Sequence, residues 1–174
     1  MSRSGVDVRT RTAADLPALV LGLRLVAEAD GYPSRWPEDP AEYVRGGDGL
    51  LGAWVADRTG EVLGQALLRR PGGQAPVRMW CAATGSRLAT VAVLSRLFVV
   101  PAGRGWGVGE ALVAAAVREA TRLGRRPVLD VVTTNRAAVR LYERLGWTRF
   151  GWYEDRFHPD GPVERLLCFA APAR

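Results

Sequence analysis

The sequence of 174 residues is poor in the side chains that build metal centres and disulfide frameworks. It contains one histidine, His158, and two cysteines, Cys81 and Cys168, which lie far apart and form no C-x-x-C pair. Zinc sites and redox-active disulfides need clusters of these residue types at short spacing. We therefore expect no bound metal, and two reduced thiols that are mostly buried as small apolar side chains.

Long apolar runs are also absent. No stretch reaches the roughly 18 uncharged apolar residues that a membrane-spanning helix requires. The chain start, residues 1–7, has no apolar segment of the kind found in secretory signals, and the apolar segment at residues 16–29 is interrupted by Arg24 and Glu28. These patterns predict a cytoplasmic protein without a membrane partner.

Basic residues outnumber acidic ones by 24 to 18, which gives a formal charge of +6, but they are spread along the chain. No block of consecutive basic residues exceeds two, and none of the common nucleic-acid-binding signatures is present. The charge is compatible with an acidic surface or an anionic small ligand as partner, and we expect no nucleic-acid partner.

The order of apolar patterns predicts a single α/β domain over residues 1–174. Capping residues, glycine stops and turn signals delimit the elements. Expected strands cover residues 6–10, 50–56, 61–68, 91–100, 127–132, 147–153 and 163–170. Expected helices cover residues 16–29, 75–84, 108–123 and 135–145. The Pro- and Gly-containing segment between Ala29 and Pro40 is expected to form a loop.

Four glycines alternate with other residues at Gly103, Gly105, Gly107 and Gly109, between an expected strand and an expected helix. Without side chains the backbone can approach a ligand closely, and the first amides of a helix have no intrahelical acceptors. Together with the helix dipole, these amides favour an anion such as a pyrophosphate. The lysine and hydroxyl of a P-loop are missing, which argues against a nucleoside triphosphate site. A Rossmann turn would follow the first strand, whereas this turn follows several strands, and Asp130 is the one acid at a spacing comparable to that of the Rossmann pattern. Both classes of site are therefore poorly supported.

Two motifs resemble those of the GNAT superfamily of acyl-CoA-dependent N-acetyltransferases. The run Arg104-Gly105-Trp106-Gly107-Val108-Gly109, preceded by Val99-Val100-Pro101, resembles the family pattern Q/R-x-x-G-x-G/A. About 30 residues further on, Asn135, Ala138, Tyr142, Gly146 and Trp147 are similar to the pattern N-x-x-A-x-x-x-Y-x-x-x-G-F/W. Two motifs in the family's order are more specific than either alone, and the resemblance extends over nearly the whole chain.

The resemblance implies an α/β (α+β) fold. Its central sheet would be mixed, mostly antiparallel and twisted, with about six or seven strands, helices on both faces, and central strands that splay at the cofactor site. It implies transfer of an acetyl group from acetyl-CoA to a primary amine by direct attack in a ternary complex. An acyltransferase for longer acyl-CoA and a non-catalytic CoA-binding regulatory module stay open as alternatives. A homodimer is compatible with the family.

The resemblance also implies roles for individual residues. Backbone groups of Leu97, Phe98 and Val99 would pair with the pantetheine arm, and the amides of Arg104, Gly105, Trp106, Gly107, Val108, Gly109 and Glu110 would bind the pyrophosphate. Asn135 and Ala138 would contact the cofactor arm, and Tyr142 would protonate the departing thiolate as general acid. From the residues alone, Tyr142 also fits a core aromatic and Asn135 also fits a helix N-cap.

The general base is not assigned by sequence. Many members of the family carry a carboxylate on the strand before the glycines, but residues 92–96 contain none. Five acids elsewhere in the chain are candidates for the general base, acting directly or through a water molecule, but each also fits an ordinary surface charge. They are Glu28, Asp30, Glu42, Glu154 and Asp155.

Side chains around the expected acceptor and cofactor sites also allow two interpretations each. Arg136 and Arg140 fit a contact to the 3′-phosphate of CoA or a solvated helix face. Tyr32 and Trp36 fit the wall of an acceptor pocket or the packing of their loop onto the core. None of them identifies the amine acceptor.

Overall fold

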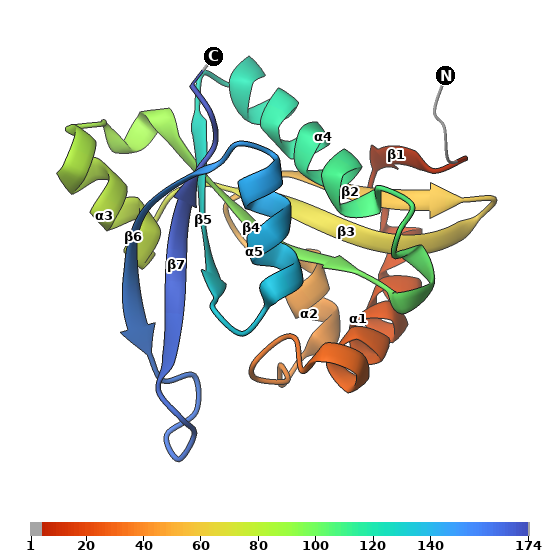
Figure 1. Cartoon of the computed structure of the whole chain (residues 1–174). Coiled ribbons are helices and arrows are strands. Elements are labelled where there is room, and N and C mark those ends of the chain that lie inside the picture. The colour runs from red at the N-terminus through yellow and green to blue at the C-terminus, as the bar shows by residue number, and fades with distance from the viewer. Residues whose placement is uncertain (1–4, 174) are drawn as a thin grey trace. The chain divides into compact units, whose positions relative to one another are not determined.

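The computed structural model describes residues 5–173, which form seven strands and five α-helices (Figure 1). The strands are ordered β1-β2-β3-β4-β5-β7-β6. The chain divides into two compact units, the first made of Met1–Leu68 and Ser95–Ala116 and the second of Arg69–Leu94 and Val117–Arg174. Residues 1–4, which entered the prediction that no secretory signal is present, lie outside the described residues. That the whole chain is one domain stays a prediction.

Strands β1 (Asp7–Thr10), β2 (Leu50–Arg58) and β3 (Glu61–Arg69) belong to the first unit, apart from the last residue of β3. Strand β1 pairs antiparallel with β2, and β2 turns into β3 through Thr59 and Gly60. Gly64 lets β3 approach β4 (Val91–Val99) closely, because a Cβ at this position would lie 2.3 Å from the carbonyl oxygen of Phe98. Only glycine is compatible with this close approach.

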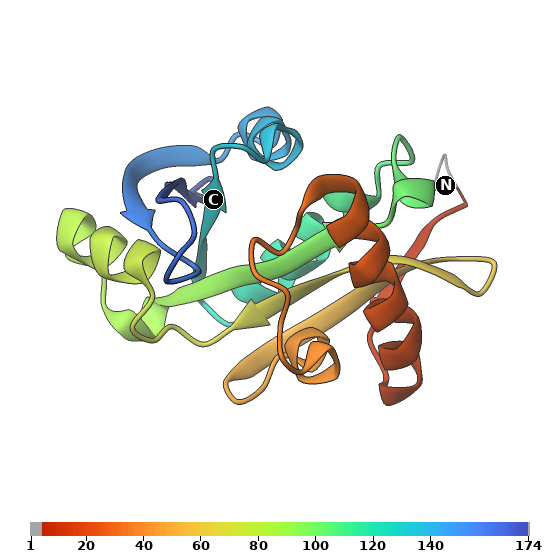
Figure 2. The same ribbon diagram turned by 90° about the horizontal axis from the view of Figure 1, so that it is seen from below.

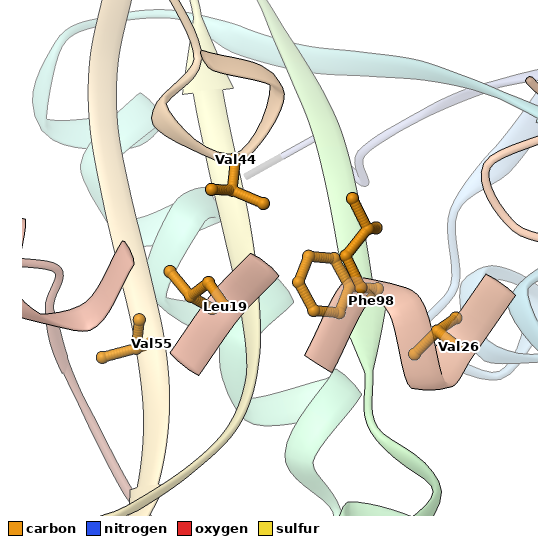
Figure 3. Close-up of a cluster of buried hydrophobic side chains, with 6 residues drawn as sticks. Leu19, Val26, Val44, Val55 and Phe98 are labelled. Carbon is orange, nitrogen blue, oxygen red and sulfur yellow. The ribbon is translucent and has the colours of Figure 1, made fainter. Parts of the chain in front are cut away.

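Helix α1 (Leu16–Asp30) and helix α2 (Pro40–Arg45) cover one side of β2 and β3, and the first turns of α4 (Val108–Arg122) lie on the other side (Figures 1 and 2). Helix α1 buries Leu19, Leu23 and Val26, whose spacing places them on one face. They pack with three further buried side chains, and Figure 3 shows the Phe98 ring pointing from β4 toward Leu19. The packing partners are Val44, Val55 and Phe98.

Helix α2 was not predicted from the sequence, where this stretch follows a Pro-rich loop. The Asp39 side chain accepts a hydrogen bond from the Glu42 amide at 2.9 Å, and Pro40 occupies the first turn. Gly46 ends the helix with a φ of 100°. These are ordinary capping signals for a helix of only six residues, which is too short to show an apolar period.

Strands β5 (Arg126–Val132), β6 (Thr148–Asp155) and β7 (Glu164–Ala170) belong to the second unit. Strand β7 pairs antiparallel with both β5 and β6. The first residues of β4 pair parallel with β5, from Val91 opposite Arg126 to Val93 opposite Val128. The sheet is therefore mixed, with antiparallel pairs beside this parallel one.

Helices α3 (Ala75–Thr84) and α5 (Arg136–Arg144) cover opposite faces of β7. The Cys168 Sγ atom lies 4.0 Å from the Met79 Sδ atom of α3, whereas the Phe169 ring packs against Tyr142 of α5, with ring centroids 5.9 Å apart. Successive residues of a strand point to opposite faces, so these contacts assign one face to each helix. The predicted mixed α/β fold with about seven strands is confirmed.

The predicted strands and helices are present with small differences in their bounds, including the short helix α3. Both cysteines are free thiols, and Cys168 is buried while Cys81 is partly exposed. Within residues 5–173, none of the helices has the length and apolar character that crossing a membrane requires.

Candidate functional site

The glycine run lies in the first unit and leads from β4 into α4. A 3-10 turn (Pro101–Gly103) follows the strand, and the Gly103 amide donates to the Val100 carbonyl at 2.9 Å. Gly105 and Gly107 then adopt φ values of 79° and 75°. Left-handed backbone of this kind is strained for residues with a Cβ, so the alternating glycines permit the path of this loop.

The start of α4 offers amides without helical acceptors. The first hydrogen bond of the helix runs from the Ala111 amide to the Gly107 carbonyl at 3.0 Å. The amides of Val108, Gly109 and Glu110 precede this bond and point out of the first turn, at the positive end of the helix dipole. A Cβ at Gly105 or Gly107 would meet no described atom within 4 Å, so the loop backbone is open on that side. This geometry fits an anionic group such as a pyrophosphate.

Arg104 differs from the rest of the predicted pyrophosphate-binding stretch. Its amide already donates to the Pro101 carbonyl at 3.2 Å, and its guanidinium forms an ion pair with Asp30 at the end of α1. The free helical amides therefore begin after Arg104. The exposed Trp106 ring lies under the guanidinium of Arg58, 4.1 Å from the ring centroid, which adds positive charge to the loop.

Strand β4 contains one irregular residue, Arg96. It comes directly before the stretch whose backbone was predicted to pair with the pantetheine arm, Leu97, Phe98 and Val99. Arg96 has a φ of 50°, which is unusual for a residue with a Cβ inside a strand and typical of a β-bulge. Its guanidinium lies 4.4 Å from the centre of the Tyr43 ring and donates to the Tyr43 carbonyl. Sequence analysis did not reveal this irregularity, because no glycine marks it.

Asn135 and Ala138 lie in the second unit at the start of α5. The Asn135 Oδ1 atom accepts a hydrogen bond from the Ala138 amide at 3.2 Å, so the predicted N-cap is confirmed. The Asn135 amide nitrogen is the side chain's donor group, and the cap uses only the acceptor. The cap interpretation and the cofactor interpretation of Asn135 thus use different atoms.

Tyr142 is 5% exposed on the apolar side of α5. Its ring packs between Trp147 and Phe169, with centroid distances of 5.3 Å and 5.9 Å. Burial, and to a smaller extent the charge of Asp130, raise the pKa of Tyr142 well above its ordinary value. The ring is therefore part of the core, and its hydroxyl stays protonated at neutral pH.

Three of the five acids considered as general bases are occupied by arginines. Asp30 pairs with Arg104, Glu42 with Arg45 and Glu154 with Arg165. Of the two aromatic residues considered for an acceptor pocket, Tyr32 packs against the α1 core, with its hydroxyl 3.2 Å from that of Tyr43, and Trp36 is 40% exposed.

A carboxylate that sequence analysis did not assign to acid–base chemistry lies on β5. Asp130 accepts a hydrogen bond from the Tyr153 hydroxyl, with 2.6 Å between the oxygens. Desolvation is the main reason that the pKa of Asp130 is raised, and the Tyr153 hydrogen bond opposes it. Asp130 lies a few residues before Asn135 and belongs to neither of the two sequence motifs, so only the structure identifies it as a candidate.

Comparison with known proteins identifies the family. Residues 24–147 match the model of the acetyltransferase (GNAT) family, so the chain belongs to this family. It is 33% identical over 95 residues to YjgM from Escherichia coli (strain K12), named as an uncharacterized N-acetyltransferase, and this match covers 54% of the chain. The chain spans about half the length of that relative, 49%.

Solved structures share the fold over nearly the whole chain. A GCN5-related N-acetyltransferase from Kribbella flavida is 28% identical, with a TM-score of 0.70, and the match covers 97% of this chain and 98% of that one. The Salmonella typhimurium protein yncA, described as an acetyltransferase with its cofactor acetyl-CoA, matches in fold at 20% identity, with a TM-score of 0.68 and coverage of 95% and 92%. The family resemblance seen in the two motifs is thus confirmed.

Proposed function

We propose that this protein is an enzyme that transfers an acetyl group from acetyl-CoA to the primary amine of an acceptor by direct attack in a ternary complex. The observation that supports it most is the start of α4, where the amides of Val108, Gly109 and Glu110 lack helical acceptors after a loop of left-handed glycines. Membership of the acetyltransferase family supports acetyl-CoA as the anionic ligand of this helix start.

Each unit, taken by itself, contains residues that we propose bind the cofactor. In the first, the amides of the loop and of the first turn of α4 bind the pyrophosphate, and backbone groups of Leu97, Phe98 and Val99 bind the pantetheine arm. In the second, the Asn135 side-chain amide donates to the arm while its oxygen caps α5. Ala138 leaves room for the arm, because its side chain is a single methyl group.

Bound acetyl-CoA supplies an activated thioester carbonyl. Tyr142 then acts as general acid, and its hydroxyl gives a proton to the leaving sulfur. A raised pKa makes a phenol a weaker acid, but the same desolvation also raises the pKa of a thiol. In this unit, burial raises the pKa of the Cys168 thiol to about 12. A thiolate in such surroundings is a stronger base than in water, so the raised pKa of the leaving sulfur partly offsets the raised pKa of Tyr142.

Screening amines with isotopically labelled acetyl-CoA and mass spectrometry tests the activity. Amino acids, polyamines, aminoglycosides and short peptides with free N-termini represent the main classes of acceptor. Transfer of label to at least one class is expected, with free CoA formed in equal amount. Label that stays on the cofactor with every amine, despite tight acetyl-CoA binding, contradicts the enzymatic proposal and favours a CoA-binding regulatory module. A parallel panel of longer acyl-CoA thioesters tests the acyl preference.

A further inference from the structure

Asp130 and Tyr153 form a hydrogen-bonded pair that reaches across a strand. Asp130 lies on β5 and Tyr153 on β6, with β7 between them in the sheet. Neighbouring strands are about 4.8 Å apart, so the pair bridges about twice that distance. The residues opposite Asp130 in the register are Cys168 and then Gly151, where a Cβ would lie 2.4 Å from the Met79 Cε atom of α3.

The acid and the tyrosine share the α3 face of the sheet. Asp130 pairs with Cys168, whose sulfur contacts Met79 of α3. Tyr142 packs on Phe169, the next residue of β7, and so belongs to the α5 face. Asp130 and Tyr142 thus lie on opposite faces of β5 and β7.

This placement matches the demands of acetyl transfer to an amine. The new C–N bond and the breaking C–S bond share one carbon, so the group that acts on nitrogen and the group that acts on sulfur must approach from different directions. Tyr142 is proposed for the sulfur. A proton acceptor for the nitrogen is expected on the other face, where Asp130 keeps an exposed surface.

We propose that Asp130 is the general base for the acceptor amine and that Tyr153 positions its carboxylate; this inference rests on the function proposed above. Asp130 takes one proton from the acceptor ammonium, and the neutral nitrogen attacks the thioester carbon. The second proton on nitrogen passes to water as the C–S bond breaks, and the sulfur receives the Tyr142 proton. Tyr142 regains a proton from water and Asp130 releases one, so each turnover yields amide, CoA thiol and one proton.

The titratable groups around Asp130 come from several elements of the second unit. Asp155 on β6 adds negative charge that raises the pKa of Asp130, in the same direction as desolvation. Tyr153 on β6 and Cys168 on β7 are neutral at physiological pH because their own pKa values are raised, and so is Tyr142 on α5. Helix α3 presents Met79 and the Cys81 thiol, and the first residues of β4 are apolar. No described cation of this unit is paired with Asp130 by an ion pair, which leaves its carboxylate free to take a proton.

Two variants and one matched control test the pair, with an amine accepted in the labelled acetyl-CoA screen as the probe. Asp130→Asn is expected to lower kcat/KM by about 100-fold or more, the usual worth of a general base, with the Kd for acetyl-CoA unchanged. Tyr153→Phe is expected to move the acidic limb of the kcat/KM pH profile to higher pH, because the lost hydrogen bond had lowered the pKa of Asp130. Glu154→Gln removes an exposed carboxylate next to Tyr153 and is expected to behave as wild type.

A carbon-13 NMR titration of the aspartate carboxyl groups gives a second readout that needs no acceptor. A raised pKa for Asp130 in the wild-type protein, raised further in Tyr153→Phe, supports the proposal. An ordinary pKa that the substitution leaves unchanged overturns it. So does an Asp130→Asn enzyme within threefold of wild type, or one whose loss of rate is matched by loss of acetyl-CoA affinity. Failure of the wild-type protein to bind acetyl-CoA would instead contradict the proposed function itself.

Discussion

The ring of Tyr142 on α5 lies against the ring of Phe169 on β7, with centroids 5.9 Å apart and planes tilted by 37°. Sequence analysis allowed two interpretations of Tyr142, a core aromatic and a general acid. The ring belongs to the core, and the hydroxyl at its end is the group proposed to donate a proton. The two roles use different atoms and are separable by substitution.

Tyr142→Phe is expected to keep the fold and lose the reaction. The ring contacts with Trp147 and Phe169 remain, so urea denaturation should give a free energy of unfolding close to that of wild type. Steady-state kinetics should show kcat lowered by about 100-fold or more, since general acid catalysis is lost. As a control, Tyr142→Ala should lower the free energy of unfolding by about 3–5 kcal/mol, as large aromatic truncations in a core do. A Phe variant with nearly wild-type kcat would leave Tyr142 with a packing role only.

Gly107→Ala is expected to weaken acetyl-CoA binding about tenfold, because a φ of 75° costs a residue with a Cβ about 1–2 kcal/mol and displaces the first amides of α4. Gly60→Ala is the matched control. Gly60 has a φ of 87° in the turn between β2 and β3, and its Cβ would also meet no described atom within 4 Å. Isothermal titration of both variants should show lost affinity only for Gly107→Ala. Equal affinities would mean that the loop does not bind the pyrophosphate.

Asn135 allows the helix cap and the proposed cofactor contact to be tested separately. Asn135→Asp keeps an acceptor for the Ala138 amide, so its thermal stability should match that of wild type, whereas Asn135→Ala should lose about 1 kcal/mol. Both variants lack the amide donor and should bind acetyl-CoA more weakly, the Asp variant most, because it places a negative charge beside an anionic ligand. Unchanged affinity of the Asp variant for acetyl-CoA would mean that Asn135 acts only as the N-cap of α5.

Asp15 makes the stability of the protein depend on acid pH. Arg9 donates two hydrogen bonds to its carboxylate, at 2.7 Å and 2.9 Å, which hold the pKa of Asp15 well below its usual range. A depressed carboxyl pKa stabilises the fold fully above the unfolded-state value of about 4, and this contribution fades as the pH falls below it. Asp15→Asn should lower the free energy of unfolding by about 1–3 kcal/mol at pH 7. Urea denaturation at decreasing pH should show this difference shrinking, and a constant difference would contradict the assignment.

The sequence predicted most of the fold because its elements carry strong local signals. Helix α1 repeats apolar residues on one face, α3 and α4 end at glycines with left-handed backbone, and Asn135 caps α5. Helix α2 escaped prediction because six residues are too few for an apolar period.

Prediction of the site was less complete, for two physical reasons. Motifs mark residues that adopt unusual backbone conformations for local reasons, such as Gly105 and Gly107 with their positive φ. The positive φ of Arg96 is instead accompanied by contacts with Tyr43, a residue far away in the sequence. Asp130 and Tyr153 are brought together by strand order across β7, which neither residue's neighbours in sequence reveal. Pairs of this kind depend on tertiary structure.

Isothermal titration of the wild-type protein with acetyl-CoA tests the central claim most directly. Acetyl-CoA is the ligand proposed for the residues around the start of α4 and, separately, for those at the start of α5. We predict binding with a Kd in the micromolar range or tighter. Absence of binding to acetyl-CoA and to every other CoA thioester would contradict the account.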